Sequence, residues 1–232
     1  MADDPAFNPA LIVVDVQEGF CPPSGALAVP NGRSILPTIN TLLTYPFVLK
    51  IATKDWHPAG HISFASSHPG AEPFTSFATI TNLENEEEKY ESRLWLDHCI
   101  QGTPGAELVK DLDISKIDKI LEKGQIKSVE MYSAFYPPLS SPRVGDSGLS
   151  TLLKEKGVTD VYVVGLAADY CVAATAEDAV KEGFRAVIVE EGTRAVDPGG
   201  WEGKKKELEG RGVRVVGMKG REVGRVRLNT KA

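Results

Sequence analysis

Short apolar runs recur along this chain and predict the strands of a β-sheet. Their Val-, Ile- and Leu-rich composition is typical of strands that are buried on both faces of a parallel sheet. The six runs cover residues 10–17, 46–56, 116–124, 160–165, 185–191 and 213–218. We therefore expect a sheet of six strands, of which the first begins close to the N-terminus.

Segments with a helical spacing of apolar residues lie between several of these runs. Residues 33–43 predict a helix, although Pro37 favours a late start. Three further helices are expected at residues 147–157, 169–183 and 201–212, and each ends in glycine, a common residue just past a helix C-terminus. Strands that alternate with helices indicate an α/β fold, with a mostly parallel sheet covered by helices on both faces.

The stretch between Asp55 and about Gly105 interrupts this rhythm. It holds all four histidines, two of the three tryptophans and the acidic run ENEEEKYE. A structureless loop of this length is unusual and often functional, whereas the acidic run itself is expected to be a solvated surface. Because no repeat or low-complexity linker divides the chain, we expect residues 1–232 to form a single domain with a long loop region at about 55–105.

Composition and charge argue against several classes of function. The chain has 42% hydrophobic and 25% charged residues, as is usual for globular proteins. Its net charge of −6 disfavours nucleic-acid binding, which needs a basic stripe, and no apolar run is long enough for a membrane span. Neither a secretory signal nor a peroxisomal tail is recognisable, and three cysteines argue against a disulfide framework. These features predict a cytoplasmic protein.

Chemically useful residues gather where the predicted strands end. Asp15 ends the first strand, Asp55 and His57 follow the second, Lys123 ends the third, and Cys171 follows the fourth. Ligands of open parallel sheets bind beyond the carboxyl ends of the strands. The sequence therefore predicts a catalytic or metal-binding site at this edge of the sheet.

Cys171 has two interpretations. A cysteine on a helix face is often a small core residue, and that interpretation requires no chemistry. However, the stretch GLAADYC places Cys171 at a predicted strand-to-helix turn. There the helix dipole and the free backbone N–H groups would lower the pKa of the thiol and could stabilise an oxyanion. Asp169 is expected to cap the same helix by accepting backbone N–H bonds.

Asp15 and Lys123 also allow a structural or a catalytic role. Asp15 could cap a loop, and Lys123 could lie on the surface. Alternatively, burial raises the pKa of Asp15 so that it acts as a general base toward the thiol of Cys171. Lys123 would then balance the charge and orient the carboxylate, which completes an activated nucleophile.

The segment DWHPAGHISF suggests a metal site. Asp55 and His57 are two residues apart in an extended segment, so both side chains point the same way. A carboxylate and an imidazole suit zinc and similar divalent ions, although a D-x-H pair alone is a weak signal. The candidates for a third ligand are His61, His68 and His98.

Six segments together resemble the nicotinamidases, and most strongly the fungal type, within the isochorismatase-like family of cysteine hydrolases. They occur in the order of the family, from about residue 10 to about residue 195. The segments are ALIVVDVQEGFCPPSGAL, ATKDWHPAGHISFA, LWLDHCIQGTPGAEL, LEKG, EMYSAF and VVGLAADYCVAATAEDAV.

The resemblance implies a doubly wound parallel sheet and a role for each matching residue. Cys171 matches the nucleophile, Asp15 the proton acceptor and Lys123 the third catalytic residue. The matching metal ligands are Asp55, His57 and His98, for Zn²⁺ or another divalent ion. His61 matches a nearby histidine that fungal-type members do not use as a ligand, but other branches use more histidines of this region, so His61 stays a reserve candidate. The residues that match positions around the substrate are Phe20, Trp95, Tyr132, Ala167 and Tyr170.

The resemblance further implies a cis peptide between Leu166 and Ala167, and an oxyanion site formed by the backbone N–H groups of Ala167 and Cys171. One departure from the family pattern is Asp97, which stands just before His98 and could orient it or alter the metal preference.

The implied activity is hydrolysis of nicotinamide to nicotinate and ammonia through a cysteine thioester, in NAD salvage. Alternatives are another amide hydrolase of the family, with a pyrazinamide-type or ureide substrate, and a non-catalytic pyridine-binding protein. The family often forms homo-oligomers, so self-association is possible here.

Overall fold

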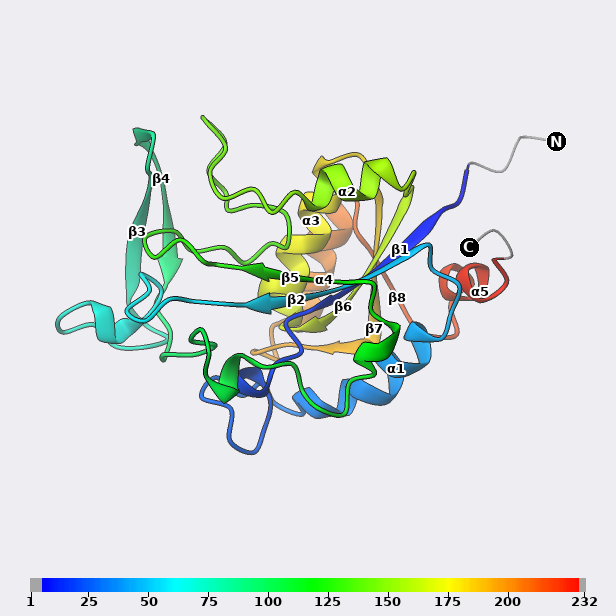
Figure 1. Cartoon of the computed structure of the whole chain (residues 1–232), viewed down its shortest axis with the longest axis horizontal. Coiled ribbons are helices and arrows are strands. Elements are labelled where there is room, and N and C mark those ends of the chain that lie inside the picture. Colours follow the sequence, from blue (N-terminus) through cyan, green and yellow to red (C-terminus); the bar gives the residue numbers. More distant parts are fainter. Residues whose placement is uncertain (1–5, 230–232) are drawn as a thin grey trace.

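The six predicted strands form one sheet in the computed structural model, which describes residues 6–229 (Figure 1). The ends of the predicted single domain, residues 1–5 and 230–232, lie outside the described residues. The strands are β1 (Pro9–Val14), β2 (Leu49–Asp55), β5 (Lys119–Lys123), β6 (Asp160–Leu166), β7 (Arg185–Arg194) and β8 (Arg214–Val216).

The order of the strands places a topological switch at the centre of the sheet. The order is β5-β2-β1-β6-β7-β8, and every neighbouring pair in it is parallel. The chain runs outward from β1 through β2 to β5, and then from β6 in the opposite direction to β8. Ligands of doubly wound sheets bind at such a switch, beyond the carboxyl ends of the strands.

Both faces of the sheet are buried against helices, as predicted. In β1, Leu11 and Val13 belong to one core, whereas Ala10, Ile12 and Val14 belong to the other, because successive side chains of a strand point to opposite faces. Helices α1 (Leu36–Leu43) and α5 (Arg221–Arg227) cover the first face, and α2 (Leu149–Glu155), α3 (Ala173–Lys181) and α4 (Trp201–Gly210) cover the second (Figure 1).

The predicted helix ends are confirmed by backbone geometry. Gly157, Gly183 and Gly212 have φ angles of +64°, +93° and +88°, which glycine adopts without the strain of a side chain. Two details differ from the prediction. The helix expected at 169–183 begins as a π-helical turn, Ala168–Val172, before α3. Helix α5 was not predicted, because it is short and contains Gly224.

The long loop region expected at about 55–105 is regular in part. This region contains an antiparallel hairpin of β3 (Phe77–Asn82) and β4 (Asn85–Arg93), which projects from the sheet (Figure 1). Alternate hairpin side chains, including Ile80 and Tyr90, pack on a small separate core, and the other face is open to solvent. The acidic run forms most of β4, so it is solvated, as expected, but regular.

Short 3₁₀ helices occur between the main elements. They are Glu18–Phe20, Gly32–Ile35, Ala65–Ser67, Pro104–Ala106 and Ile114–Lys116.

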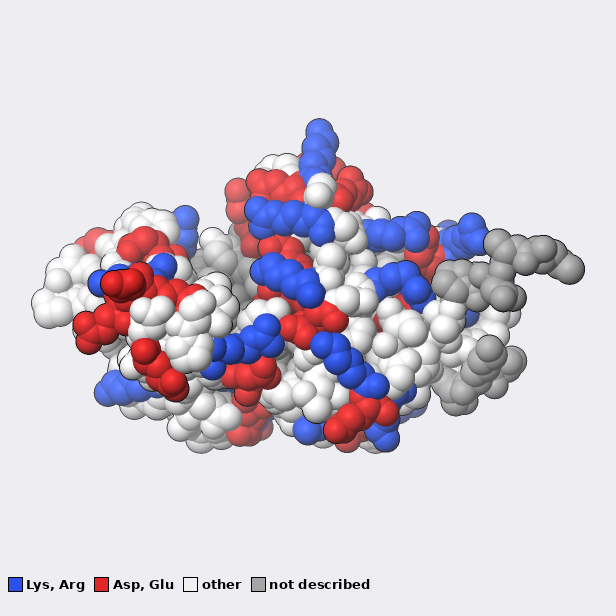
Figure 2. All heavy atoms as spheres, turned by 90° about the horizontal axis from the view of Figure 1, so that it is seen from above, with Lys and Arg blue, Asp and Glu red and all other residues white. Residues whose placement is uncertain are grey.

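On the face seen in Figure 2, basic and acidic side chains are interspersed. Among residues 6–229, none of the helices combines the length and the apolar character needed to cross a membrane.

Candidate active site

The predicted catalytic residues meet at the carboxyl edge of the sheet. Asp15 follows β1 directly and has a φ of +48°, and Cys171 lies in the π turn that follows β6. Asp55 and Lys123 end two adjacent strands and are partners in the register of β2 and β5. All four side chains are buried, so the parallel sheet brings residues together that are far apart in sequence.

Lys123 is the centre of this cluster. Its Nζ lies 3.0 Å from Asp15 Oδ2 and 2.5 Å from Asp55 Oδ1. The same Nζ donates to the carbonyl of Met131 at 3.0 Å and lies 3.7 Å from Cys171 Sγ. Burial would lower the pKa of Lys123, but the carboxylates of Asp15 and Asp55 raise it well above its usual value. Lys123 is therefore a fixed positive charge between two acids and a thiol.

The carboxyl group of Asp15 has one bound oxygen and one oxygen that accepts no hydrogen bond. Oδ1 accepts a bond of 2.6 Å from Thr53 Oγ1, whereas Oδ2 has only the ion pair with Lys123. Burial raises the pKa of Asp15 to about 6, and the charge of Lys123 opposes this rise. Ligand atoms of Asp15, Asp55 and Cys171 lie within 4.8 Å of one another. Asp15 can therefore accept a proton from the thiol near neutral pH.

The expected lowering of the Cys171 pKa is not found. Burial raises the pKa of this thiol well above its usual value, and the positive charge of Lys123 only partly opposes the rise. The reason is that the sulfur is enclosed by protein, so the loss of hydration outweighs the field of the helix start. The resting cysteine is thus a thiol, and a base beside it is needed for its activation.

The turn that carries Cys171 is closed by its own backbone. The carbonyl of Ala167 accepts from the N–H groups of Tyr170 and Val172, both at 3.1 Å. The peptide between Leu166 and Ala167 is cis, as the resemblance implied.

The prediction that Asp169 caps this helix is wrong. Its side chain forms no bond within the turn; instead Oδ1 and Oδ2 accept from the backbone N–H groups of Val196 and Asp197, each at 2.9 Å. The carboxylate therefore points toward the loop after β7 and away from the helix.

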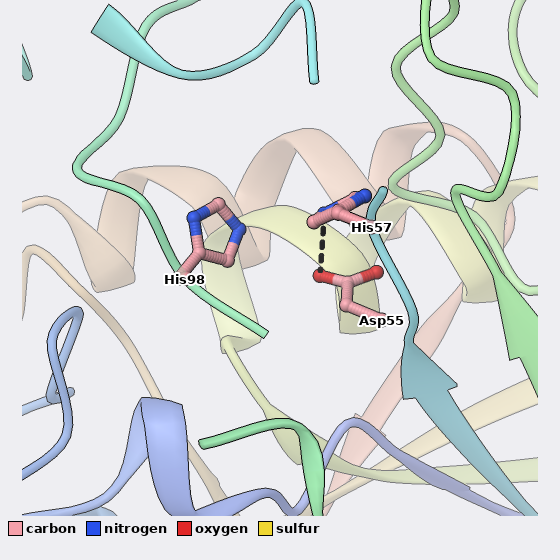
Figure 3. A group of neighbouring side chains, drawn as sticks. All are labelled: Asp55, His57 and His98. Atoms are coloured by element: carbon pink, nitrogen blue, oxygen red, sulfur yellow. Dashed lines mark ion pairs between the residues drawn. The ribbon is translucent and has the colours of Figure 1, made fainter. Parts of the chain in front are cut away.

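Asp55, His57 and His98 form a candidate metal centre. One ligand atom from each lies within 4.8 Å of the others, and the three side chains are buried. Figure 3 shows them pointing toward one another, with Asp55 and His57 from the end of β2 and His98 from a separate segment. His57 Nε2 lies 3.7 Å from Asp55 Oδ2 and accepts or donates no hydrogen bond. A buried nitrogen that forms no hydrogen bond fits a site that holds a cation.

Backbone carbonyls orient both imidazole rings. His57 Nδ1–H donates to Gly124 at 2.9 Å, and His98 Nδ1–H donates to Leu96 at 2.7 Å, so the Nε2 atoms face the centre. Such outer bonds fix the ring orientation at metal sites. Gly124 has a φ of +67°, and a Cβ there would lie 2.5 Å from His57 Cε1, so only glycine allows this contact.

The charges of the three groups suit a divalent ion. Burial would raise the pKa of Asp55, but Lys123 and then His57 lower it well below its usual value. Burial lowers the pKa of His98 to about 4, with a further contribution from His57. For His57 itself, burial would lower the pKa, but Asp55 raises it. The set thus offers a carboxylate and two imidazoles, ligand types that zinc takes in proteins.

The other candidate ligands are occupied by protein partners. His61 stacks on His57 with ring centroids 4.1 Å apart, accepts from Ser63 Oγ at 2.8 Å and donates to the carbonyl of Val129 at 3.1 Å. His57, His61 and Glu130 form a second possible ligand group, but His61 would have to break these bonds to join it.

His68 and Asp97 also point away from the candidate metal centre. His68 donates to the carbonyl of Ile62 at 2.7 Å. Asp97, which departs from the family pattern, accepts from Ser66 Oγ at 2.5 Å, whereas the carbonyl of Leu96 orients His98.

Beside Cys171 and His98 lies a pocket with two different walls. On one side, the rings of Trp95 and Tyr132 both contact Tyr170, with centroids 4.9 and 5.6 Å away, and Trp95 Nε1 donates to Tyr132 at 2.9 Å. Phe20 contacts the ring of His98, with ring centroids 5.3 Å apart. Each predicted substrate-binding residue lines this pocket, which is surrounded by Phe20, Leu27, Asp55, Trp95, His98, Glu130, Tyr132, Ala167, Tyr170, Cys171 and Val196.

Sequence reasoning missed three residues of this lining: Leu27, Glu130 and Val196. Glu130 is buried, and one of its oxygens accepts from the N–H of Met131 at 2.7 Å. An acid within the apolar run VEMY was the signal that could have found it. Leu27 and Val196 carry no comparable signal, because apolar residues occur in every loop.

The sheet and its edge define an α/β protein with a buried thiol, carboxylate and ammonium group at the switch point. The isochorismatase domain family matches residues 9–219, and this chain belongs to that family.

Three relatives show to which members of the family this chain is similar. A nicotinamidase of Acinetobacter baylyi is 43% identical over 84% of this chain and 85% of its own length. The structure of the yeast nicotinamidase bound to the inhibitor nicotinaldehyde has a TM-score of 0.84 and 33% identity, over 90% of this chain and 99% of that chain. A pyrazinamidase of Pyrococcus horikoshii in complex with zinc has a TM-score of 0.69 and 34% identity, with 90% and 99% covered.

Proposed function

We propose that this protein is a nicotinamidase, an amidohydrolase that converts nicotinamide and water to nicotinate and ammonia in NAD salvage. Relatives that bear this name support the substrate. The observation that carries the proposal is the position of Lys123 Nζ, which lies within 3.7 Å of Cys171 Sγ and contacts both Asp15 and Asp55. This arrangement joins a nucleophile, a base and a metal-site carboxylate in one buried cluster.

In the proposed reaction, Asp15 removes the proton of Cys171, and the thiolate attacks the carboxamide carbon. The oxyanion is bound by the backbone N–H groups of Ala167 and Cys171. Asp15 then gives the proton to the amide nitrogen, the C–N bond breaks, ammonia leaves and the thioester forms. A water molecule that Asp15 deprotonates hydrolyses the thioester to nicotinate, which restores the thiol.

Lys123 holds the charge of the cluster constant during these steps. When Asp15 is protonated, the thiolate replaces it as the negative partner of the ammonium group. The aromatic wall of Trp95, Tyr132 and Tyr170 encloses the substrate ring together with Phe20.

We propose that Asp55, His57 and His98 hold Zn²⁺ or another divalent ion. A zinc-bound relative supports the metal, and the buried Nε2 of His57, which forms no hydrogen bond, supports the ligand set. Such an ion supplies a positive charge that attracts the lone pair of a pyridine nitrogen.

The direct test is release of ammonia from nicotinamide by the purified protein, with and without a chelator. We expect hydrolysis that the chelator abolishes and added Zn²⁺ restores. Hydrolysis of a ureide but not of nicotinamide would instead indicate a different amidase of the family, and pyridine binding without turnover would indicate a binding protein.

We further propose that residues 1–232 act as a single cytoplasmic domain with a small-molecule substrate and no nucleic-acid partner. The acidic net charge of −6 supports the last point. That the protein forms homo-oligomers is a prediction, which measurement of its molecular mass in solution can test.

A further inference from the structure

Two apolar residues of the pocket lining, Leu27 and Val196, form what we call the apolar wall, and Val196 lies in the loop that follows β7. Val196 lines the pocket beside Cys171 and packs, like Leu27, on the core that contains Phe20 and Ala167. Unlike the aromatic wall, whose rings contact one another, Val196 belongs to a loop outside the regular elements. Its position is therefore set by its packing on this core and by the hydrogen bonds of the loop backbone.

Asp169 supplies those bonds. Its two carboxylate oxygens accept from two consecutive N–H groups, of Val196 and Asp197, both at 2.9 Å. Hydrogen bonds to a charged group are stronger than neutral ones, and a pair of them also fixes orientation. Asp169 lies in the same turn as Tyr170 and Cys171. One side chain thus ties the apolar wall to the turn that carries the nucleophile.

We infer that Asp169 is a positioning residue that sets the distance between Val196 and Cys171, and that Val196 thereby limits which ring-substituted pyridine carboxamides enter the pocket. The inference rests on the proposed function, because it concerns the substrate range of the same site. It assigns Asp169 no contact with the substrate.

Selectivity distinguishes this role from a general structural one. The substrates are nicotinamide and the set of its ring-methylated derivatives, and kcat and KM are measured for each. A methyl group in an apolar pocket changes kcat/KM by about 10–200-fold. We expect Val196→Ala to increase kcat/KM for at least one methylated substrate, relative to nicotinamide, by about 10-fold or more. Asp169→Ala should shift the same ratio in the same direction, mainly through KM.

The double variant sharpens the test. If Asp169 acts through Val196, the double change should shift the ratio no further than Val196→Ala alone, because the two residues act as one unit. Asp169→Asn retains one acceptor oxygen and should give an intermediate shift. A change of kcat by the same factor for every substrate would overturn the inference, because it would mean that Asp169 only supports the turn.

Glu88 provides a matched control. Its carboxylate also accepts from two consecutive N–H groups, of Ser140 and Ser141, at 2.8 and 3.1 Å, but none of the three lines the pocket. Glu88→Ala should leave the ratio unchanged; an equal shift in this variant would also overturn the inference. Failure of the wild-type protein to hydrolyse nicotinamide would instead refute the proposed function. An active wild type with unaltered selectivity in the Val196 and Asp169 variants would refute the inference alone.

Discussion

Two regions meet at the pocket, and they are built differently. The carboxyl edge of the sheet contributes Asp15, Lys123 and Cys171, which are buried and connected by ion pairs and close polar contacts. The segment between β2 and β5, with its projecting hairpin, contributes Trp95 and His98, which are held by ring contacts and by single hydrogen bonds.

The first region thus carries the groups proposed to react, whereas the second carries residues proposed to bind the metal and the substrate ring. A charge cluster on adjacent strands tolerates little displacement, because each member neutralises another in a medium of low polarity. Aromatic and imidazole groups on an inserted segment can move slightly and still enclose a ring. We therefore expect changes at the sheet edge to act on kcat, and changes in the inserted segment to act on metal content and KM.

The largest expected effect is at the nucleophile. Cys171→Ala should abolish hydrolysis, since no other group can form the thioester. Mass spectrometry of a trapped reaction should show the nicotinoyl group on Cys171. Cys21→Ala is the control, because Cys21 is equally buried but lies outside the pocket lining. Turnover by Cys171→Ala would disprove covalent catalysis at this residue.

The second-largest effect is expected at Asp15, the proposed base. Asp15→Asn keeps the shape of the side chain but cannot accept a proton, so kcat should fall by about 10²–10⁴-fold. Lys123→Met should also be severe, and the double variant should lose little more than either single one, as expected for residues that act as a unit. Strict additivity of the two losses would show that the ion pair is not part of the catalytic group.

Changes at the metal ligands test the inserted segment between β2 and β5. His98→Ala should remove most of the bound metal, as measured by elemental analysis, because only two protein ligands remain. His61→Ala is the matched control and should lower the metal content by much less, since both of its nitrogens bind protein groups. Retention of metal in the first variant and loss in the second would reassign the ligand set to the group that contains Glu130.

The pH profile should show the buried acid directly. With burial raising the pKa of Asp15 to about 6, the carboxylate that accepts the proton predominates above this pH and is lost below it. Hence kcat/KM should be constant in neutral solution and fall about 10-fold for each pH unit below the pKa. A profile that stays flat down to pH 4, with the metal retained, would contradict the role of Asp15.

The smallest effect is expected at the aromatic wall. Trp95→Phe keeps a ring but removes the bond of 2.9 Å to Tyr132. One hydrogen bond contributes about 0.5–1.5 kcal/mol, so KM should rise by about two- to tenfold while kcat changes little. A larger fall in kcat than rise in KM would show that the two regions are not separable in this way.

Periodicity predicted the sheet but not the insertion. Strands such as β6 are continuous apolar runs, because both of their faces are buried. In β4, by contrast, one face is solvated and carries glutamates, so the strand has the composition of a charged loop. Its pairing with β3 depends on contacts with residues such as Val129 and Leu139, which are distant in sequence.

The sequence predicted those residues of the candidate site that lie at the ends of strands. Asp15, Asp55, Lys123 and Cys171 were found because parallel strands deliver their last residues to one edge. The direction of the Asp169 side chain was not predictable, because its partners are 27 and 28 residues away in a loop. The raised pKa of Cys171 depends on enclosure from several segments, which position beside a helix does not reveal.

The place of Lys123 in the sheet has a consequence for the opening motions of the protein. Strand β5 lies at the edge of the sheet and, among residues 6–229, pairs with β2 alone. Segments with few buried side chains open most readily, and Lys123 is the one buried residue of β5. If β5 detaches, the ammonium group leaves both carboxylates, and two buried negative charges remain without their counterion. Local unfolding of this margin and inactivation of the centre are therefore a single cooperative event.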